Sequence, residues 1–83
     1  MNGVIKRVTA LENFILEAEF TSGIIKQYDM KPVLNEIEAF SEMKENPELF
    51  QKVAVDTGGY GVVWNERLDL ASEEIWDYGI SIK

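Results

Sequence analysis

The stretch Phe14-Ile-Leu-Glu-Ala-Glu-Phe-Thr-Ser-Gly-Ile-Ile-Lys-Gln-Tyr-Asp-Met30 decides the fold. In its first seven residues, apolar side chains alternate with two glutamates, which is typical of a strand with one buried face. Gly23 can adopt the positive φ of a tight turn, and an apolar alternation resumes after it. The apolar positions are Phe14, Leu16, Ala18 and Phe20 in the first segment and Ile24, Tyr28 and Met30 in the second. An antiparallel hairpin is predicted.

The neighbouring sequence extends this hairpin into a larger sheet. Residues 4–10 are rich in β-branched side chains and are separated from the hairpin by a polar pair, so we expect a three-stranded meander. Residues 53–55 and 62–64 are short apolar runs on either side of Thr57-Gly-Gly-Tyr-Gly61. The glycines between them predict a second hairpin that carries Tyr60 at its tip.

Between the hairpins the apolar spacing changes to three and four residues, starting at Pro32. This spacing predicts one helix over residues 32–43 that packs on the sheet and leaves its glutamates in water. The apolar side of that helix consists of Val33, Leu34, Ile37 and Phe40, and the exposed acids are Glu36, Glu38 and Glu42. Asn46 as a cap and Pro47 as the first helical residue predict a second, short helix.

A last short helix is predicted over residues 69–78, with Asp69 available as its cap and Gly79 at its end. The 83 residues contain no linker or repeat, so residues 1–83 are expected to form one domain. The predicted fold class is α+β: a small, mainly antiparallel sheet, made of the N-terminal meander and the second hairpin, with two or three short helices.

The amino-acid types present exclude several kinds of chemistry. The chain has no cysteine and no histidine, which removes thiolate catalysis, cysteine-based zinc sites and the histidine-containing catalytic relays. No calcium-loop pattern is present either. We therefore expect no catalytic residue, no metal site and no bound cofactor.

The charge is unevenly distributed along the chain. The net charge is −7, and residues 36–83 carry eleven acids against four bases, whereas residues 1–35 carry four of each. A nucleic-acid backbone requires clustered lysine and arginine, so direct binding to nucleic acid is not expected. No segment is apolar over the length of a signal sequence or a membrane span, so we expect a cytoplasmic protein without a membrane association.

Two motifs could indicate chemistry but are better explained structurally. The glycine-rich turn leads into a strand-like segment rather than a helix and lies beside Asp56, so a hairpin turn is favoured over a phosphate-binding loop. Each pair of neighbouring carboxylates lies in a stretch whose other face is apolar, which is typical of solvent-exposed positions. The pairs are Glu17/Glu19, Glu36/Glu38 and Glu73/Glu74.

Several short motifs, in their order and spacing, resemble the prokaryotic domain-of-unknown-function family 2442. They are Phe20-Thr-Ser-Gly23, Asp29, Asn46-Pro-Glu-Leu-Phe50, Val53-Ala-Val55, Val63-Trp64, Asp69-Leu70 and Glu73-Glu-Ile-Trp76. The family's pattern after its tryptophan is Pro-Asn-Gly, where this chain has Asn65, Glu66 and Arg67, so the conformation of that turn is not carried over. The resemblance implies a small, soluble bacterial or archaeal α+β protein, with gene neighbours that suggest toxin–antitoxin pairs. It implies no active site.

The leading functional hypothesis is a non-enzymatic module that binds another small, basic protein, as the acidic, antitoxin-like member of a two-gene pair. The expected binding surface consists of Tyr60, Trp64, Asp69, Glu73, Glu74 and Trp76, with aromatic anchors and acids that steer the partner. Two alternatives remain open at this point. One is a small-ligand sensor or minor enzyme that uses carboxylates in a pocket between sheet and helices, and the other is a homodimer formed through a free strand edge.

Overall fold

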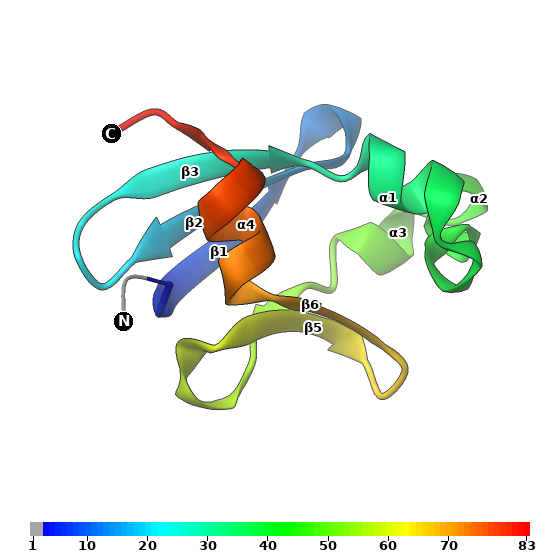
Figure 1. Ribbon diagram of the computed structural model, residues 1–83. Coiled ribbons are helices and arrows are strands. Elements are labelled where there is room, and N and C mark those ends of the chain that lie inside the picture. Colours follow the sequence, from blue (N-terminus) through cyan, green and yellow to red (C-terminus); the bar gives the residue numbers. More distant parts are fainter. Residues whose placement is uncertain (1–2) are drawn as a thin grey trace.

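The predicted N-terminal meander forms one side of the molecule in the computed structural model, which describes residues 3–83 (Figure 1). Its strands are β1 (Ile5–Leu11), β2 (Ile15–Phe20) and β3 (Ile25–Asp29), paired antiparallel in that order. On β2, Leu16, Ala18 and Phe20 have no exposed surface, whereas the residues between them are half-buried. The period-2 pattern that predicted this sheet is confirmed.

A fourth strand, β7 (Ile80–Ser81), lies beside β3 and completes this sheet. It was not predicted, because two residues are too few to show an alternation. Gly79 ends the last helix, and its N–H still donates to the carbonyl of Ile75. The chain continues from there in an extended conformation along β3, so the sheet order is β1-β2-β3-β7.

The second sheet has three strands, one more than the predicted hairpin. It consists of β4 (Ala54–Val55), β5 (Gly61–Asn65) and β6 (Leu68–Ala71), and a short 3-10 turn, η3 (Thr57–Gly59), joins the first two. The hairpin is confirmed, but the prediction of a helix from residue 69 is wrong. The side chain of Asn65 accepts the N–H groups of Arg67 and Leu68, which folds the chain into a turn and returns it as a strand.

The prediction of one continuous helix over residues 32–43 is also wrong. It divides into α1 (Lys31–Glu36), a 3-10 turn η2 (Glu38–Phe40) and α2 (Glu42–Glu45), with a break at Ile37, where φ is −109° and ψ is 109°. Ile37 was expected to pack on the sheet but is 48% exposed. The break lets the ring of Phe40 meet that of Trp64 edge to face, at 5.6 Å, so tertiary packing outweighs the local helical pattern.

Two more helices complete the fold: α3 (Pro47–Phe50) and α4 (Ser72–Tyr78). Neither has the side-chain cap that was expected, because Asn46 makes no capping bond and α4 is preceded by Ala71 instead of Asp69. Helices α1, α2 and α3 gather at one end of the molecule, opposite both chain termini, and α4 lies against β3 and between the two sheets (Figure 1).

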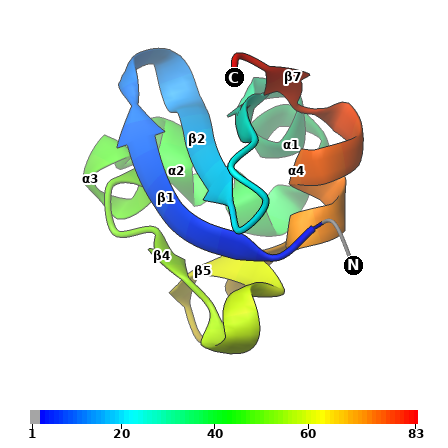
Figure 2. The ribbon, with the colours of Figure 1, turned by 90° about the vertical axis from the view of Figure 1, so that its left-hand side faces the viewer.

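The core lies between the two sheets and is closed by α4 on one side and by the three clustered helices at one end. Strand β1 curves across the molecule until it lies next to β4, which joins the sheets along that border (Figure 2). The largest fully buried side chains are Phe20, Phe50, Leu16, Met30, Leu34, Met43 and Ile75. None of the helices in residues 3–83 combines the length and the hydrophobicity that crossing a membrane requires.

Candidate functional site

Tyr60, the first of the expected surface residues, is indeed exposed at the end of the second hairpin. Its side chain is 60% exposed and its ring lies over Gly58, where a Cβ atom would come within 2.8 Å of the ring carbons. The carbonyl of Tyr60 accepts the N–H of Ser72 at 2.9 Å. This bond connects the hairpin to the first residue of α4, so Tyr60 lies next to the segment that carries Glu73.

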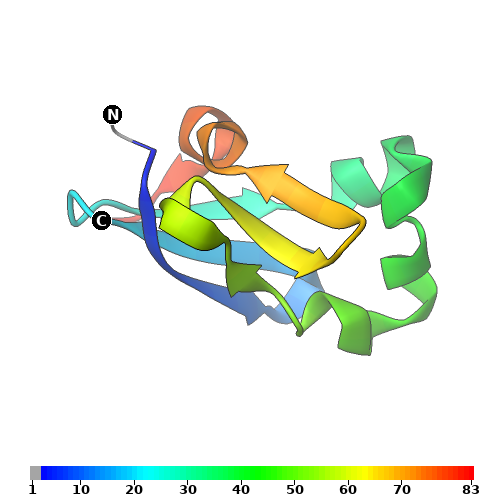
Figure 3. The same cartoon turned by 90° about the horizontal axis from the view of Figure 1, so that it is seen from below.

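Asp69 lies on the outer face of the same three-stranded sheet. The strand register places Ala54, Val63 and Asp69 in one row across β4, β5 and β6, and Gly61 beside Ala71 in the next. Figure 3 views this face directly, and no element of residues 3–83 lies in front of β5 and β6. The result is a mostly uncharged surface with Tyr60 and the acids Asp69 and Glu73 around it. We call these residues and the outer face of β4, β5 and β6 the Tyr60 surface.

Trp64 does not belong to this surface, contrary to the expectation. Only 6% of its side chain is exposed, and its indole N–H donates to the carbonyl of Phe50 at 3.1 Å. Its neighbour in sequence, Val63, is the residue that pairs with Asp69. Because successive residues of a strand point to opposite faces, Trp64 faces the core, where it holds the second sheet against α3.

Trp76 and Glu74 are used within the fold. The Trp76 ring meets Phe20 edge to face at 4.9 Å, and the ammonium of Lys26 lies 4.5 Å from the ring centre. Glu74 accepts the hydroxyl of Tyr28 at 2.8 Å. Burial and the neighbouring Glu74 carboxylate both raise the pKa of Tyr28 above its ordinary value. The predicted surface therefore separates into exposed residues and residues that attach α4 to the sheet.

The ion pairs of residues 3–83 leave the acids of the second half uncompensated. They involve Glu19 with Arg7 and Lys6, at 2.7 and 4.0 Å, and Asp29 with Lys31, at 2.9 Å. All of these residues belong to the first half of the chain. Asp69 and Glu73 are exposed and form no ion pair with any residue that the structure describes. The Tyr60 surface therefore has an unbalanced negative charge at its border.

The glycine-rich turn is a structural turn, as predicted. It joins β4 to β5, and the Asp56 carboxylate accepts the N–H of Thr57 within it. Gly58 and Gly59 both have a φ of 80°. A Cβ atom on Gly59 would lie 2.5 Å from the carbonyl oxygen of Ile5, so the turn is pressed against the start of β1. No helix follows that could direct its N–H groups at a phosphate.

A large groove lies elsewhere, at the end where the helices gather, and sequence reasoning did not find it. Its volume is about 560 Å³, within the range of ligand pockets. The lining residues are Leu11, Glu12, Asn13, Phe14, Lys31, Pro47, Phe50 and Gln51. Asn13 and Phe14 have left-handed backbones, with φ of 62° and 58°. Asn13 was the one available signal, because asparagine adopts this conformation more readily than most residues.

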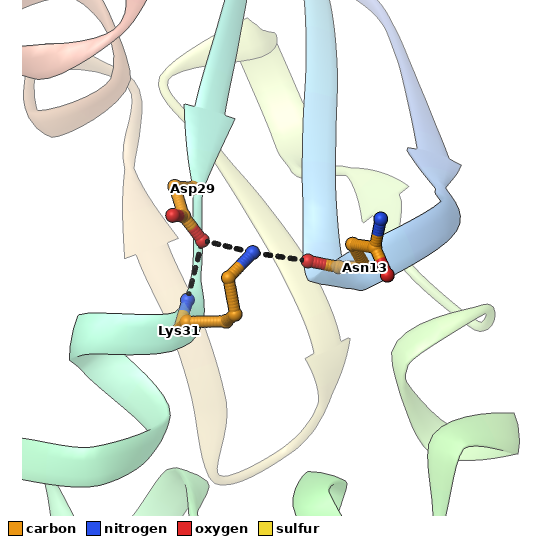
Figure 4. A network of polar contacts seen from close by, with 3 residues as sticks. All are labelled: Asn13, Asp29 and Lys31. Atoms are coloured by element: carbon orange, nitrogen blue, oxygen red, sulfur yellow. Dashed lines mark hydrogen bonds and ion pairs between the residues drawn. The ribbon is translucent and has the colours of Figure 1, made fainter.

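A polar network fixes the border of this groove (Figure 4). The ammonium of Lys31 donates to the carbonyl of Asn13 at 2.7 Å and contacts the carboxylate of Asp29 at 2.9 Å. Asp29 also accepts the backbone N–H of Lys31 at 2.9 Å. Partial burial alone would raise the pKa of Asp29, but the hydrogen bonds and charge of Lys31 outweigh it, and the pKa is lowered.

Of the neighbouring carboxylates, Glu17 and Glu19 make contacts within the four-stranded sheet. Glu19 is paired with Arg7, and Glu17 accepts the side-chain amide of Gln27 at 3.0 Å. The large groove has one carboxylate, Glu12. Within residues 3–83, no three carboxylates come together in a way that could hold a metal ion.

Comparison with known proteins agrees with the resemblance seen in the sequence. The model of a family described as "Protein of unknown function (DUF2442)" matches residues 5–81. Comparisons with curated proteins and with solved structures find no match.

Proposed function

The chain belongs to the DUF2442 family, and from that premise we propose that it is a non-enzymatic protein-interaction module. Its binding surface is the Tyr60 surface, and its partner is another small, basic protein. We place it in the cytoplasm of a prokaryote, as the acidic, antitoxin-like member of a two-gene pair.

One observation carries this proposal: an exposed aromatic ring lies next to acids that no cation of the described residues neutralises. Tyr60 is 60% exposed, and large aromatic side chains supply much of the binding energy at protein interfaces. Asp69 and Glu73 are exposed and unpaired within residues 3–83. Unpaired acids around an uncharged surface attract a basic partner and increase its association rate.

A tagged pull-down from the native lysate tests the proposal. We expect one basic partner in stoichiometric amount. Tyr60→Ala should weaken its binding by about tenfold or more, as at an interface hot spot, while Tyr60→Phe keeps the ring over Gly58 and should bind almost normally. Asp69→Asn with Glu73→Gln should slow association and reduce its dependence on salt.

The matched control is Glu36→Gln with Glu38→Gln, which removes the same charge from exposed positions at the helical end. This control should bind as the wild type does. Two results would contradict the proposal: the absence of any stoichiometric partner, or a partner that is lost from the control and retained by the Tyr60 and Asp69/Glu73 variants.

Self-association through the edge of the four-stranded sheet is a second candidate. Tyr78, Ile80 and Ile82 are 72%, 73% and 51% exposed, and they lie together around β7 at that edge. An exposed apolar strand edge favours pairing with another chain. Light scattering on a sizing column should then detect a dimer that Ile80→Ser with Ile82→Ser converts to a monomer. A wild-type monomer at every concentration would rule this candidate out.

A further inference from the structure

A second hollow of about 210 Å³ adjoins the large groove. Phe14 and Lys31 line both. The second hollow is otherwise lined by Leu34, Asn35 and Lys44. The two hollows thus adjoin at Phe14 and Lys31. The larger lies beside Phe50, and the smaller is also mostly apolar but has Lys31, Asn35 and Lys44 among its lining residues. Both lie at the helical end of the molecule and share no residue with the Tyr60 surface.

The two hollows differ in charge. Two of the five residues that line the second hollow are lysines and none is an acid, although the protein as a whole carries a net charge of −7. Lys31 is neutralised by Asp29. Lys44 forms no ion pair with any residue in 3–83, and its ammonium contacts only the side-chain oxygen of Asn35, at 3.4 Å. That arrangement leaves the NH₂ group of Asn35 free to donate to a ligand.

We propose that the two hollows form a site for a small amphipathic monocarboxylate, an aryl- or alkyl-substituted acid. Its carboxylate lies in the second hollow, between the ammonium of Lys44 and the amide of Asn35, because both are donors and Lys44 has an unbalanced charge. Its apolar group extends past Phe14 into the larger groove, against Leu11, Pro47 and Phe50. Glu12 lines only the larger part and repels the carboxylate from that end, so the ligand has one orientation.

The site is formed before any ligand arrives, which reduces the entropy cost of binding. The ring of Phe14 is held edge to face by Phe50 at 5.3 Å. Its carbonyl accepts the N–H of Met30 at 2.9 Å, and Lys31 holds the carbonyl of Asn13. Left-handed backbones at two successive non-glycine residues are uncommon and concentrate at functional sites.

An NMR titration of the full chain with 3-phenylpropanoate tests the proposal. We expect saturable shifts confined to the backbone N–H groups of residues 11–14, 31, 33–35, 44–46 and 48–51. The neutral 3-phenylpropanamide should bind about tenfold more weakly, since it loses a charge-assisted hydrogen bond. Acetate, which lacks the apolar group, should bind more weakly still.

Variants of exposed lysines locate the carboxylate. Lys44→Gln should lower the affinity for phenylpropanoate to that of the amide and leave binding of the amide unchanged. The matched control is Lys52→Gln, because Lys52 is also exposed and lines neither hollow. It should change neither affinity, and the spectra of both variants show directly whether they are folded.

Three results would overturn the assignment. The first is the absence of saturable shifts at about 10 mM phenylpropanoate, where a site of millimolar affinity is mostly occupied. The second is equal affinity for phenylpropanoate and acetate, which indicates simple ion pairing. The third is wild-type affinity in Lys44→Gln. None of these measurements involves a protein partner, so failure here is distinct from failure of the proposed interaction surface.

Discussion

Phe14 combines an unfavourable backbone with favourable side-chain packing. A left-handed conformation costs a residue with a Cβ atom about 1–2 kcal/mol, and Phe14 has a φ of 58°. Its ring is half-buried against Phe50. Phe14→Ala removes the ring and keeps the backbone cost, whereas Phe14→Gly removes both. We therefore expect Phe14→Gly to be the more stable of the two variants, by about 1 kcal/mol in urea unfolding.

Position 15 supplies the control for this comparison. Ile15 is also half-buried, but its φ is −98°, in the ordinary extended region. Glycine there gains nothing from the backbone and loses more conformational entropy on folding, so Ile15→Gly should be less stable than Ile15→Ala. The order of alanine and glycine should thus reverse between positions 14 and 15. Alanine more stable than glycine at both positions would show that the backbone of Phe14 is unstrained.

Gly59 and Gly23 have similar backbones and different surroundings. Their φ values are 80° and 92°, so alanine carries a left-handed cost at both. At Gly59 the new Cβ would also lie 2.5 Å from the carbonyl oxygen of Ile5, whereas nothing lies within 4 Å at Gly23. Gly59→Ala should therefore lower the free energy of unfolding by at least about 1 kcal/mol more than Gly23→Ala. Equal losses in chemical denaturation would mean that β1 can move away.

Lys26 attaches α4 to the sheet. Its ammonium donates to the carbonyl of Trp76 in the last turns of α4 and also lies over the Trp76 ring. A cation at that end of a helix is favourable, and the ring adds a cation–π contact. Lys26→Met keeps the apolar stem, so it should destabilise by about 1–2 kcal/mol. Amide hydrogen exchange should accelerate most in α4.

The control for this prediction is Lys6→Met. Lys6 is exposed and lies 4.0 Å from Glu19, which Arg7 also pairs at 2.7 Å. Surface ion pairs of this kind contribute little to folding stability. The loss of stability should therefore be small, and the amide hydrogens of α4 should exchange at the wild-type rate. Faster exchange of α4 in both variants would indicate a general effect of lost positive charge rather than the attachment through Lys26.

The elements that the sequence predicts correctly are those in which local pattern and tertiary packing agree. In β2, alternate residues are both apolar and buried, and Gly23 supplies the turn that follows. The errors occur where a contact that the local pattern does not show determines the structure of a segment. The contact of Phe40 with Trp64 accompanies the break at Ile37, and the bonds that Asn65 accepts convert the expected start of α4 into β6. Neither contact leaves a periodic signal in the sequence.

The candidate sites divide in the same way. Exposure of Tyr60, Asp69 and Glu73 could be predicted, because a residue at a turn tip or on the polar side of an element is usually in water. The burial of Trp64 could not be predicted. The ring of Phe40 packs against it, and the sequence pattern did not indicate the break at Ile37 that accompanies this contact. Prediction of the large groove would have required knowledge of the two left-handed residues, Asn13 and Phe14, and of the packing of α3, which begins 33 positions after Phe14.

At the scale of the whole molecule, the contact between α4 and the sheet makes the free energy of unfolding depend on pH in the alkaline range. Tyr28 is 7% exposed and donates its hydroxyl to Glu74. Burial and the Glu74 carboxylate raise its pKa above the ordinary 10.0, so the folded state favours the protonated phenol. A raised pKa contributes stability that is complete below the unfolded-state pKa and is lost as the pH rises above it.

The difference in stability between the wild type and Tyr28→Phe should follow this dependence. At pH 7 the variant lacks a hydrogen bond to a charged acceptor and should be less stable by about 1.5–3 kcal/mol. Between about pH 9 and pH 11 the unfolded wild type begins to ionise at position 28 and the variant cannot, so the difference should shrink. Urea unfolding at each pH measures this difference.

The control is Tyr60→Phe, at a 60% exposed position, which should leave the difference in stability from the wild type constant across this pH range. A constant difference for Tyr28→Phe as well would mean that the folded protein ionises Tyr28 as readily as the unfolded chain does, and that the Glu74 contact does not hold α4 on the sheet.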